Sequence, residues 1–376
     1  MSTSAKKPKE RLRVGIVGGG FMGQVHGRAA LVSGATVTGA VGSSPERAEA
    51  AAEATGAERG FAFLDELLAS DIDVVHVCTP NNTHRDVTLK ALDAGKHVVC
   101  EKPLTTSLQD ATGLQAAAAD TGLVGAVPFV YRYHPMVREL RTRIAAGEAG
   151  VITSLHGSYL QDWLAGADDQ NWRVDDTTGG PSRTFADIGS HWCDLTEFVT
   201  GDRIAAISAQ LRTVRTQRGG VDVKTEDLAT AQFRTEAGVV GTIVVSQVAA
   251  GRKNRLYLEV SGTESSFGFD QEDPDRLWVG HRDASQLLTR DPDTLSPAAA
   301  RVNRLPAGHA QGYQDAFDSF VADSYKAVLG DRPDGLPDFA AGARSARVVD
   351  AVLRSAADDS AWITVDNAAD IAVENA

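Results

Sequence analysis

The feature that most constrains the fold is a glycine-rich turn near the start of the chain. Residues 12–17 (LRVGIV) form a short apolar run, and Gly18, Gly20 and Gly23 follow with the spacing GxGxxG. Residues 22–33 can then form a helix. In this context the first glycine permits a tight turn, the second admits a pyrophosphate and the third lets helix and strand pack. A turn without a ligand is the alternative, but the pattern favours a dinucleotide site at the helix N-terminus.

Strand and helix patterns go on alternating up to about residue 130. Apolar runs predict strands over 36–41, 73–78, 96–100 and 123–130. The segments PERAEAAAEA, DELLAS, HRDVTLKALDAG and SLQDATGLQAAAADTG predict helices between them. Strands that are apolar on both faces and separated by helices indicate a doubly wound parallel sheet. We therefore expect an α/β fold with a disordered tail over 1–10 and a Rossmann dinucleotide-binding domain over 11–130.

The pattern changes after residue 130. A helix is predicted over 134–146, and a run of strands follows without helices between most of them. The strand candidates are 151–161, 204–214, 223–235, 238–248, 255–261 and 264–269. Two helices (310–329 and 337–356) and a short strand (AWITV) end the chain, and 281–308 resembles an irregular loop. Residues 131–376 are therefore expected to form an α+β domain with a large open, mostly antiparallel sheet, whose last helices can pack back on the first domain.

Charge and cysteine content exclude several classes of protein. With 37 Lys and Arg against 50 Asp and Glu, the net charge is −13, so nucleic acid and anionic membranes are not expected partners. The three cysteines (Cys78, Cys100 and Cys193) are too few for a disulfide framework and fit a reducing compartment. The polar N-terminus and the lack of a long apolar run predict a cytoplasmic protein.

The end of the second predicted strand bears on which nicotinamide nucleotide binds. A carboxylate there would hold the ribose 2′-hydroxyl of NAD, but residues 41–47 read VGSSPER, with no acid at the strand tip. Ser43 and Ser44 can hydrogen-bond a phosphate, and Arg47 can pair with it. This slightly favours NADP, while NAD bound without a carboxylate stays open.

Polar residues with catalytic potential follow the third and fourth long strands. Glu101, Lys102 and Pro103 come directly after strand 96–100, at the sheet edge where such folds bind ligands. A lysine there can polarise a carbonyl or stabilise an alkoxide. The segment Thr79–Pro80–Asn81, with His84 after it, ends the neighbouring strand and is expected to border the nicotinamide.

A second cluster surrounds Asp187 and His191. If this segment is helical, the two residues are four apart and share a face. Histidine suits the removal of a hydroxyl proton as hydride leaves the same carbon, and the carboxylate would fix its tautomer and raise its pKa. A buried structural histidine is the alternative. His191, Cys193 and Asp194 point apart on a helix and have no second ligand cluster, so no metal is expected.

Together these motifs resemble the glucose–fructose oxidoreductase, inositol dehydrogenase and rhizopine catabolism family (Gfo/Idh/MocA). The resemblance rests on GxGxxG at 18–23, TPN at 79–81 with His84, EKP at 101–103 and DIGSHWCD at 187–194. It runs from about residue 11 to the C-terminus. It implies hydride transfer between NAD(H) or NADP(H) and the hydroxyl of a sugar, glycoside or cyclitol. It also implies a homodimer or homotetramer assembled through the outer face of the second sheet.

The resemblance also assigns roles to single residues. Lys102 matches the catalytic lysine, and Asp187 with His191 matches the substrate-binding and acid/base pair. Phe21, Met22, Asn81, His84, Glu101, Trp172 and Arg173 match positions at the cofactor, and Tyr131, Gln161, Asp162, Trp163 and Arg183 match positions at the substrate. Segment 158–163 is similar to that of members that oxidise sugars such as levoglucosan. Val130 departs from the family, in which many members carry Asn.

Three functions remain open at this point. The leading one is a sugar or polyol dehydrogenase that uses Lys102 and His191. The second is a redox-neutral glycosidase with a tightly bound NAD, which would share the fold and most motifs. The third is a non-catalytic sensor of sugar or cofactor, since a fold does not fix a function.

Overall fold

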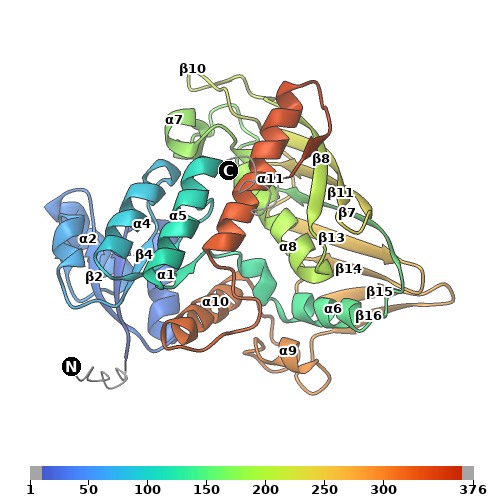
Figure 1. Cartoon of the computed structure of the whole chain (residues 1–376), viewed down its shortest axis with the longest axis horizontal. Coiled ribbons are helices and arrows are strands. Elements are labelled where there is room, and N and C mark those ends of the chain that lie inside the picture. Colours follow the sequence, from blue (N-terminus) through green and yellow to red (C-terminus); the bar gives the residue numbers. More distant parts are fainter. Residues whose placement is uncertain (1–10, 366–376) are drawn as a thin grey trace.

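The computed structural model describes residues 11–365 and begins with a parallel sheet of six strands (Figure 1). The strand order is β3-β2-β1-β4-β5-β6, and every pair is parallel. The strands are β1 (Arg13–Val17), β2 (Thr36–Val41), β3 (Gly60–Phe61), β4 (Val74–Val77), β5 (His97–Cys100) and β6 (Gly125–Ala126). The order reverses between β1 and β4, and ligands of doubly wound sheets bind at such a switch point. The predicted fold class is confirmed.

Helices cover this sheet, and two of them begin and end at capping residues. They are α1 (Phe21–Val32), α2 (Pro45–Thr55), α3 (Leu64–Leu68), α4 (His84–Asp93) and α5 (Leu108–Thr121). Ser44 caps α2 by accepting from the Arg47 N–H, and Gly56 ends that helix in a left-handed conformation. Ser107 and Gly122 do the same for α5. Serine before and glycine after a helix satisfy backbone groups that have no partner within it.

The second sheet has nine strands in the order β16-β15-β14-β13-β7-β12-β11-β8-β17. The strands are β7 (Ile152–Leu160), β8 (Ile204–Arg212), β11 (Leu228–Thr235), β12 (Val240–Ser246), β13 (Arg255–Gly262), β14 (Ser266–Asp270), β15 (Arg276–Gly280), β16 (Ser285–Thr289) and β17 (Ile363–Thr364), with the hairpin β9 (Gln217–Arg218) and β10 (Val221–Asp222) beside the sheet. Only β7 and β12 pair in parallel. The sheet is therefore mixed but mostly antiparallel.

One face of this sheet is covered and the other is open. Helices α6 (Pro135–Ala145), α8 (Ser190–Thr200) and α11 (Phe339–Ala357) pack on the covered face (Figure 1). On β12, Gly241, Ile243 and Val245 are buried, whereas the alternate residues Val240, Thr242 and Val244 are exposed. This period of two is typical of an antiparallel-type sheet with a single covered face.

The last long helices join the two halves of the molecule. Helix α10 (Tyr313–Val328) buries Phe317 and Phe320 in one core with Val14 and Ile16 of β1. Helix α11 contributes Phe339 to the core around β4 and β5, and Val352 to the core under the second sheet. The chain thus returns to its first half after it has built the second.

Several predicted boundaries are wrong. Strand 123–130 shrinks to β6, because Val127 donates to the Pro337 carbonyl and a 3₁₀ turn begins at Val130. Strand 223–235 begins only at Leu228. The segment 281–308 is not irregular throughout: it holds β16 and α9 (Pro297–Ala300). The short strands β3 and β15 were also missed, because two to five residues carry little periodicity.

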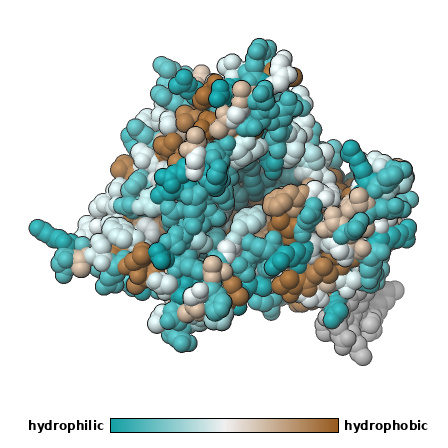
Figure 2. All heavy atoms as spheres, turned by 180° about the vertical axis from the view of Figure 1, so that it is seen from behind, coloured by the Kyte–Doolittle hydropathy of each residue, from teal (hydrophilic) through white to brown (hydrophobic). Residues whose placement is uncertain are grey.

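Hydrophilic side chains cover most of the face seen in Figure 2, and hydrophobic ones lie in separate groups. Within residues 11–365, no helix is long and apolar enough to cross a membrane. Among the same residues, no group of three or more His, Cys, Asp or Glu side chains could hold a metal ion.

Candidate active site

A cleft of about 1140 Å³ runs along the carboxyl edge of the parallel sheet. Its walls come from the loops after β1, β2, β4 and β5 and from residues 161–187 of the second half. Among the predicted site residues, it is lined by Gly18, Gly20, Phe21, Met22, Ser43, Arg47, Thr79, Pro80, Asn81, His84, Glu101, Lys102, Gln161, Trp163, Trp172, Arg173 and Asp187. Predictions made from separate motifs therefore converge on one cavity.

The glycine turn fits a pyrophosphate. Gly18 has a φ of +104°, and a side chain on it would lie 2.7 Å from the Cys78 carbonyl oxygen. A Cβ on Gly23 would lie 2.1 Å from the Gly18 carbonyl oxygen, whereas one on Gly20 would meet nothing within 4 Å. Gly20 precedes α1, whose first turn has no side-chain cap and no acidic residue. The free N–H groups of that turn can therefore receive phosphate oxygens.

The loop after β2 holds one basic side chain at the cleft. The Arg47 guanidinium donates to the Ser43 hydroxyl at 3.2 Å, and both residues line the cavity. Ser44 does not line it, because its hydroxyl caps α2 and donates to Glu46 at 2.8 Å. Of the three residues expected to bind a 2′-phosphate, Ser43 and Arg47 are thus placed to do so and Ser44 is not.

Asn81 and His84 hold the walls of the cleft together. The Asn81 amide donates to the Gly179 carbonyl at 2.9 Å. The two ring nitrogens of His84 lie 2.9 Å from the carbonyl oxygens of Thr79 and Pro103. These contacts tie the loop after β4 both to the second half of the chain and to the loop that carries Lys102.

Lys102 and Asp187 form an ion pair inside the cleft. The Lys102 ammonium donates to the Asp187 carboxylate and, at 3.0 Å, to its backbone carbonyl. The other carboxylate oxygen accepts from Gln247 at 2.8 Å, and Arg173 Nε lies 3.6 Å from the first. Burial alone would raise the pKa of Asp187, but Lys102 and Arg173 outweigh it and hold that pKa well below its usual range. The carboxylate is therefore ionised and faces two cations.

The expected pairing of Asp187 with His191 is wrong. Residues Phe185–Gly189 form a π-helical turn before α8, and this turn aims the carboxylate at Lys102. Among the described residues, His191 Nδ1 has no hydrogen-bond partner. Burial lowers the pKa of His191 well below its ordinary value, Lys102 lowers it further, and Asp187 only partly opposes them. The imidazole is therefore neutral, where the sequence predicted a raised pKa.

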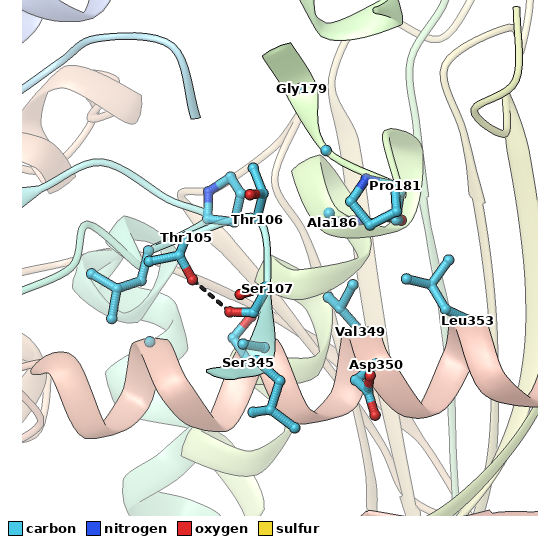
Figure 3. Close-up of a pocket in the computed structure, with 17 residues that line it drawn as sticks. Thr105, Thr106, Ser107, Gly179, Pro181, Ala186, Ser345, Val349, Asp350 and Leu353 are labelled. Atoms are coloured by element: carbon cyan, nitrogen blue, oxygen red, sulfur yellow. Dashed lines mark hydrogen bonds between the residues drawn. The ribbon is translucent and has the colours of Figure 1, made fainter. Parts of the chain in front are cut away.

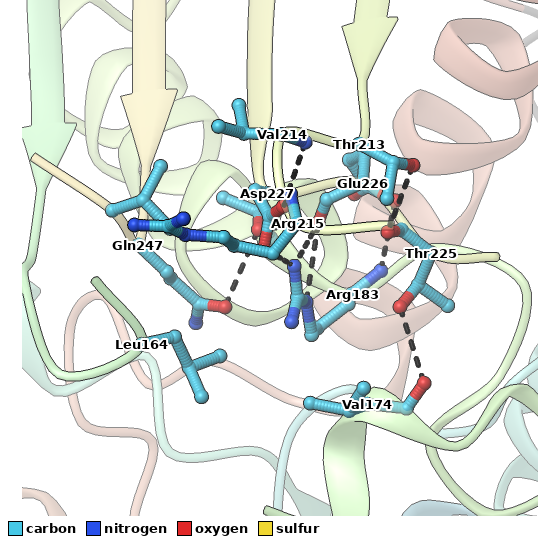
Figure 4. A network of polar contacts seen from close by, with 12 residues as sticks. Leu164, Val174, Arg183, Thr213, Val214, Arg215, Thr225, Glu226, Asp227 and Gln247 are labelled. Carbon is cyan, nitrogen blue, oxygen red and sulfur yellow. Dashed lines mark hydrogen bonds and ion pairs between the residues drawn. The ribbon is translucent and has the colours of Figure 1, made fainter. Parts of the chain in front are cut away.

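A buried network anchors the segment before Asp187 (Figure 4). The Glu226 carboxylate accepts from the Ser182 hydroxyl at 2.7 Å and from the Phe185 N–H at 2.8 Å. Arg183 is ion-paired with Asp227, and neither side chain is exposed. Arg183 was expected to bind substrate, but it does not line the cleft. It acts instead as a buried tether for the turn that carries Asp187.

Gln161 and Trp163 line the part of the cleft contributed by the second half of the chain, and a network of amide and phenol groups lies behind them. Trp163 donates to Gln161 at 2.7 Å, and Gln161 donates to Asn254 at the same distance. Asn254 also accepts from Tyr159 at 2.8 Å, and the Tyr159 phenol contacts that of Tyr131. The Tyr131 ring in turn stands edge-on to His191, with centroids 5.0 Å apart. Polar groups and ring faces of this kind suit a hydroxylated ring.

Sequence reasoning both missed and misplaced residues here. Asp162, Tyr131 and His191 were predicted at the substrate, but none of them lines the cleft. Asp162 instead pairs with Lys253 at 2.7 Å. Gln247 and Asn254 were not predicted, although they contact Asp187 and Gln161. Each lies just outside a strand and belongs to no motif, so the sequence carried no local signal for them.

A smaller cavity of about 180 Å³ lies behind the loop that follows Lys102 (Figure 3). Residues 103–108 and 179–182 form two of its walls, and Ser345, Val349 and Leu353 of α11 form the third. Thr105 donates to the Ser107 carbonyl within it at 2.7 Å. The segment after Lys102 and the segment before the π-helical turn of Asp187 thus leave a cavity between themselves and α11.

Known proteins resemble both halves of the chain. A family model described as "Oxidoreductase family, NAD-binding Rossmann fold" matches residues 12–129, and one described as "GFO/IDH/MocA C-terminal domain" matches 137–268. Levoglucosan dehydrogenase of Pseudarthrobacter phenanthrenivorans is 31% identical over 392 residues, covering 95% of this chain and 98% of that protein.

Solved structures agree with these matches. A levoglucosan dehydrogenase in complex with NADH and levoglucosan superposes with a TM-score of 0.89 at 30% identity, covering 95% of this chain and 100% of that one. An inositol dehydrogenase homologue of Azotobacter vinelandii, complexed with NADH and myo-inositol, gives a TM-score of 0.84 at 28% identity, covering 95% and 98%. The resemblance expected from the motifs is confirmed: this chain belongs to the Gfo/Idh/MocA family of oxidoreductases.

Proposed function

We propose that the chain is an NAD(P)-dependent dehydrogenase that moves hydride between a nicotinamide and a secondary hydroxyl or ketone of a sugar or cyclitol. One observation carries the proposal. The Lys102–Asp187 ion pair lies in a cleft whose other end holds the glycine turn. The neutral His191 does not line that cleft, but it lies close enough for the charges of Lys102 and Asp187 to act on its pKa. A cationic donor beside an unprotonated base is what oxidation of an alcohol requires.

The residues divide the chemistry between them. The Lys102 ammonium has three donors, and Asp187 takes up two of them, so the third can hold the reacting oxygen. Asp187 fixes the ammonium and is itself fixed by Gln247. The neutral imidazole of His191 accepts the hydroxyl proton as the alkoxide character of the oxygen grows. When bound, the nicotinamide supplies the hydride acceptor or donor at its ring.

A neutral sugar ring is the substrate class that the wall from the second half of the chain favours. Gln161 and Trp163 present an amide group and an indole to the cleft, and these suit hydroxyls on an apolar ring face. The likeness to levoglucosan dehydrogenase along almost the whole chain supports an anhydrosugar as the first compound to try.

The cofactor preference is a separate proposal. Arg47 and Ser43 line the adenosine end of the cleft, and the tip of β2 carries no carboxylate. These features slightly favour NADP. NAD stays open, because both structures compared above hold NADH.

A homo-oligomer and a cytoplasmic location remain predictions. The exposed residues Val240, Thr242 and Val244 on the open face of the second sheet support a dimer or tetramer formed through that face. A molar mass measured by light scattering tests this expectation.

The function is tested with NAD⁺ and NADP⁺, each mixed with anhydrosugars, free aldoses, inositols and glycosides. Reduced nicotinamide and sugar product are followed in parallel, and the Lys102→Ala variant controls for contaminating dehydrogenases. Reduced cofactor that appears with one sugar class, in the parent chain only, supports the proposal. Loss of a glycoside without reduced cofactor would replace it with the redox-neutral glycosidase. Cofactor binding without turnover of any sugar would replace it with the sensor.

A further inference from the structure

A chain of four titratable side chains runs from the cleft into the core of the first half. The Glu101 carboxylate lies 3.0 Å from His26 Nε2, and His26 Nδ1 lies 2.7 Å from His76 Nδ1. The other nitrogen of His76 lies 3.0 Å from the Tyr325 hydroxyl. The two imidazoles are completely buried, and Glu101 and Tyr325 are 6% and 4% exposed. The mechanism proposed above uses none of these contacts.

The contact between two Nδ1 atoms limits the protonation states of this chain. Only one of the two nitrogens can carry the hydrogen, because the other must accept it. In the first state Tyr325 donates to His76, His76 donates to His26, and His26 donates to Glu101. Both histidines are then neutral and the chain carries one negative charge.

A second state holds one more proton with the same heavy-atom positions. His26 then donates from both nitrogens, to Glu101 and to His76, while His76 donates to the Tyr325 oxygen. The chain is now neutral overall. All three contacts are satisfied in either state, so the chain can gain or lose a proton by reversing two hydrogen bonds.

Several other titratable groups surround these four side chains. Burial would raise the pKa of Glu101, but its bond to His26 and the charges of His26, Lys102 and His84 lower it. Burial lowers the pKa of His76, and His26 lowers it further. Burial raises the pKa of Tyr325. The remaining neighbours are the Cys78, Cys100 and Tyr313 side chains, which interact with Glu101, and Cys78 also faces Tyr325.

Glu101 connects this chain to the cofactor. It lines the cleft beside Lys102, at the end away from Ser43 and Arg47, where the nicotinamide would lie. An oxidised nicotinamide is a cation and a reduced one is neutral. In a buried site a single charge has a strong electrostatic effect. The state of the four side chains with one negative charge therefore stabilises the oxidised, cationic ring, whereas their neutral state favours the reduced, neutral ring.

We propose that the Glu101–His26–His76–Tyr325 chain takes up one proton from solvent when reduced nicotinamide binds and releases it when oxidised nicotinamide binds. This inference rests on the proposed nicotinamide site. The proton is not part of hydride transfer: there the alcohol gives two electrons and hydride to the ring, and its hydroxyl proton goes to His191. Because His26 donates to Glu101 in both states, the added proton enters at the Tyr325 end. Tyr325 passes its proton to His76, His76 passes one to His26, and the Tyr325 oxygen binds the new proton.

The test is calorimetry of cofactor binding to the full chain without sugar. NADH, NADPH, NAD⁺ and NADP⁺ are each titrated near neutral pH in buffers that differ in ionisation enthalpy. The dependence of the observed heat on the buffer gives the number of protons taken up. We expect the reduced cofactor to take up more protons than the oxidised one, by up to one proton. Equal uptake would overturn the proposal, whereas failure of all four cofactors to bind would instead overturn the nicotinamide site.

Variants locate the proton. His26→Gln keeps a donor towards Glu101 but cannot titrate, so the difference in uptake should vanish. Tyr325→Phe leaves the buried His76 donor of the second state without an acceptor, and orphaned buried N–H groups are rarely tolerated. Uptake of the proton should then shift to lower pH.

Tyr133→Phe is the matched control, because it removes another buried phenol hydroxyl, one that has no partner among the described residues. A difference that persists in His26→Gln would place the proton elsewhere, and the Tyr325→Phe shift decides the question if His26→Gln does not fold.

Discussion

Two ion pairs flank the same π-helical turn and differ in what surrounds them. Lys102 and Asp187 are 13% and 14% exposed, whereas Arg183 and Asp227 are not exposed at all. Asp227 also accepts from Arg218 and from two backbone N–H groups, and Arg183 donates to the Glu226 carbonyl. Arg183 and Asp187 are only four residues apart, yet the ion pair of Arg183 is sealed from the cleft and the ion pair of Asp187 is open to it.

Access to the cleft, and not charge or an unused donor, separates the two pairs: Arg183 Nη1 also has no hydrogen-bond partner among the described residues, but no ligand can reach it because it is buried. The sealed pair forms bonds only with its own surroundings, so it can only fix the backbone. The pair in the cleft keeps one ammonium donor for a ligand and has a neutral imidazole nearby. Each of the following changes tests one side of this contrast.

The largest effect is expected where the sealed pair is broken. Asp227→Ala leaves Arg183 and Arg218 without their buried carboxylate, and loss of one partner of a buried pair costs about 3–5 kcal/mol. Urea unfolding should show this loss in the free energy of unfolding. Asp176→Ala, which removes an exposed partner of Lys224, is the control and should change stability by less than about 0.5 kcal/mol. Equal stability of the two variants would mean that the network does not anchor the turn.

The next largest effect is expected at the pair in the cleft, and there on catalysis. Lys102→Met removes the donor that we propose for the reacting oxygen, and loss of such a donor lowers turnover by about 10²–10³-fold. Thermal unfolding and cofactor binding should stay close to those of the parent chain, because the ammonium is partly exposed. The matched control is Lys224→Met. Turnover near that of the parent would remove Lys102 from the mechanism.

The sequence predicted the contacts within one local motif, but not those between residues far apart along the chain. Lys102 follows a strand, and the parallel sheet places strand ends at one edge, so a local motif located it. Gln247 reaches Asp187 only because β12 pairs with β7, which sets Gln161 against the Ser246 carbonyl at 2.7 Å. The residues of one strand do not determine how it aligns with the other, so this contact could not be predicted from the sequence.

The direction of side chains in the turn was beyond prediction for a different reason. An α-helix would place Asp187 and His191 on one face, but the π-helical turn changes their relative direction. Arg183 lies close to the same motif, yet Glu226 and Asp227, more than forty residues away, turn it inward. Composition and spacing identify these residues without fixing which of them face the ligand.

A smaller effect is expected at the far end of the cleft, on cofactor choice. Arg47→Ala removes the one basic side chain placed to pair with a 2′-phosphate. Because Arg47 is exposed, the pair is worth at most about 1 kcal/mol, or about fivefold in affinity. The ratio of kcat/KM for NADP⁺ to that for NAD⁺ should fall by this factor, with the value for NAD⁺ unchanged. An unchanged ratio would mean that Arg47 does not face the phosphate.

The smallest effect concerns the pH at which the cleft loses its base. A histidine of ordinary pKa would be half protonated, and half as active as a base, at about pH 6.5. Such a base would lose about a third of its unprotonated form between pH 7 and 6.5. Burial and Lys102 lower the pKa of His191, so kcat/KM should stay nearly constant over that range. The acidic limb of kcat/KM is measured as a pH profile and compared with an NMR titration of the His191 ring.

Lys102→Met should move that titration to higher pH, because it removes the nearby positive charge. Asp227→Ala, where the fold persists, should move it less, since its charge belongs to the sealed network. A limb centred at pH 6.5 or above would show that burial and Lys102 do not lower the pKa of His191, and the assignment of His191 as a neutral base beside Lys102 would lose its support.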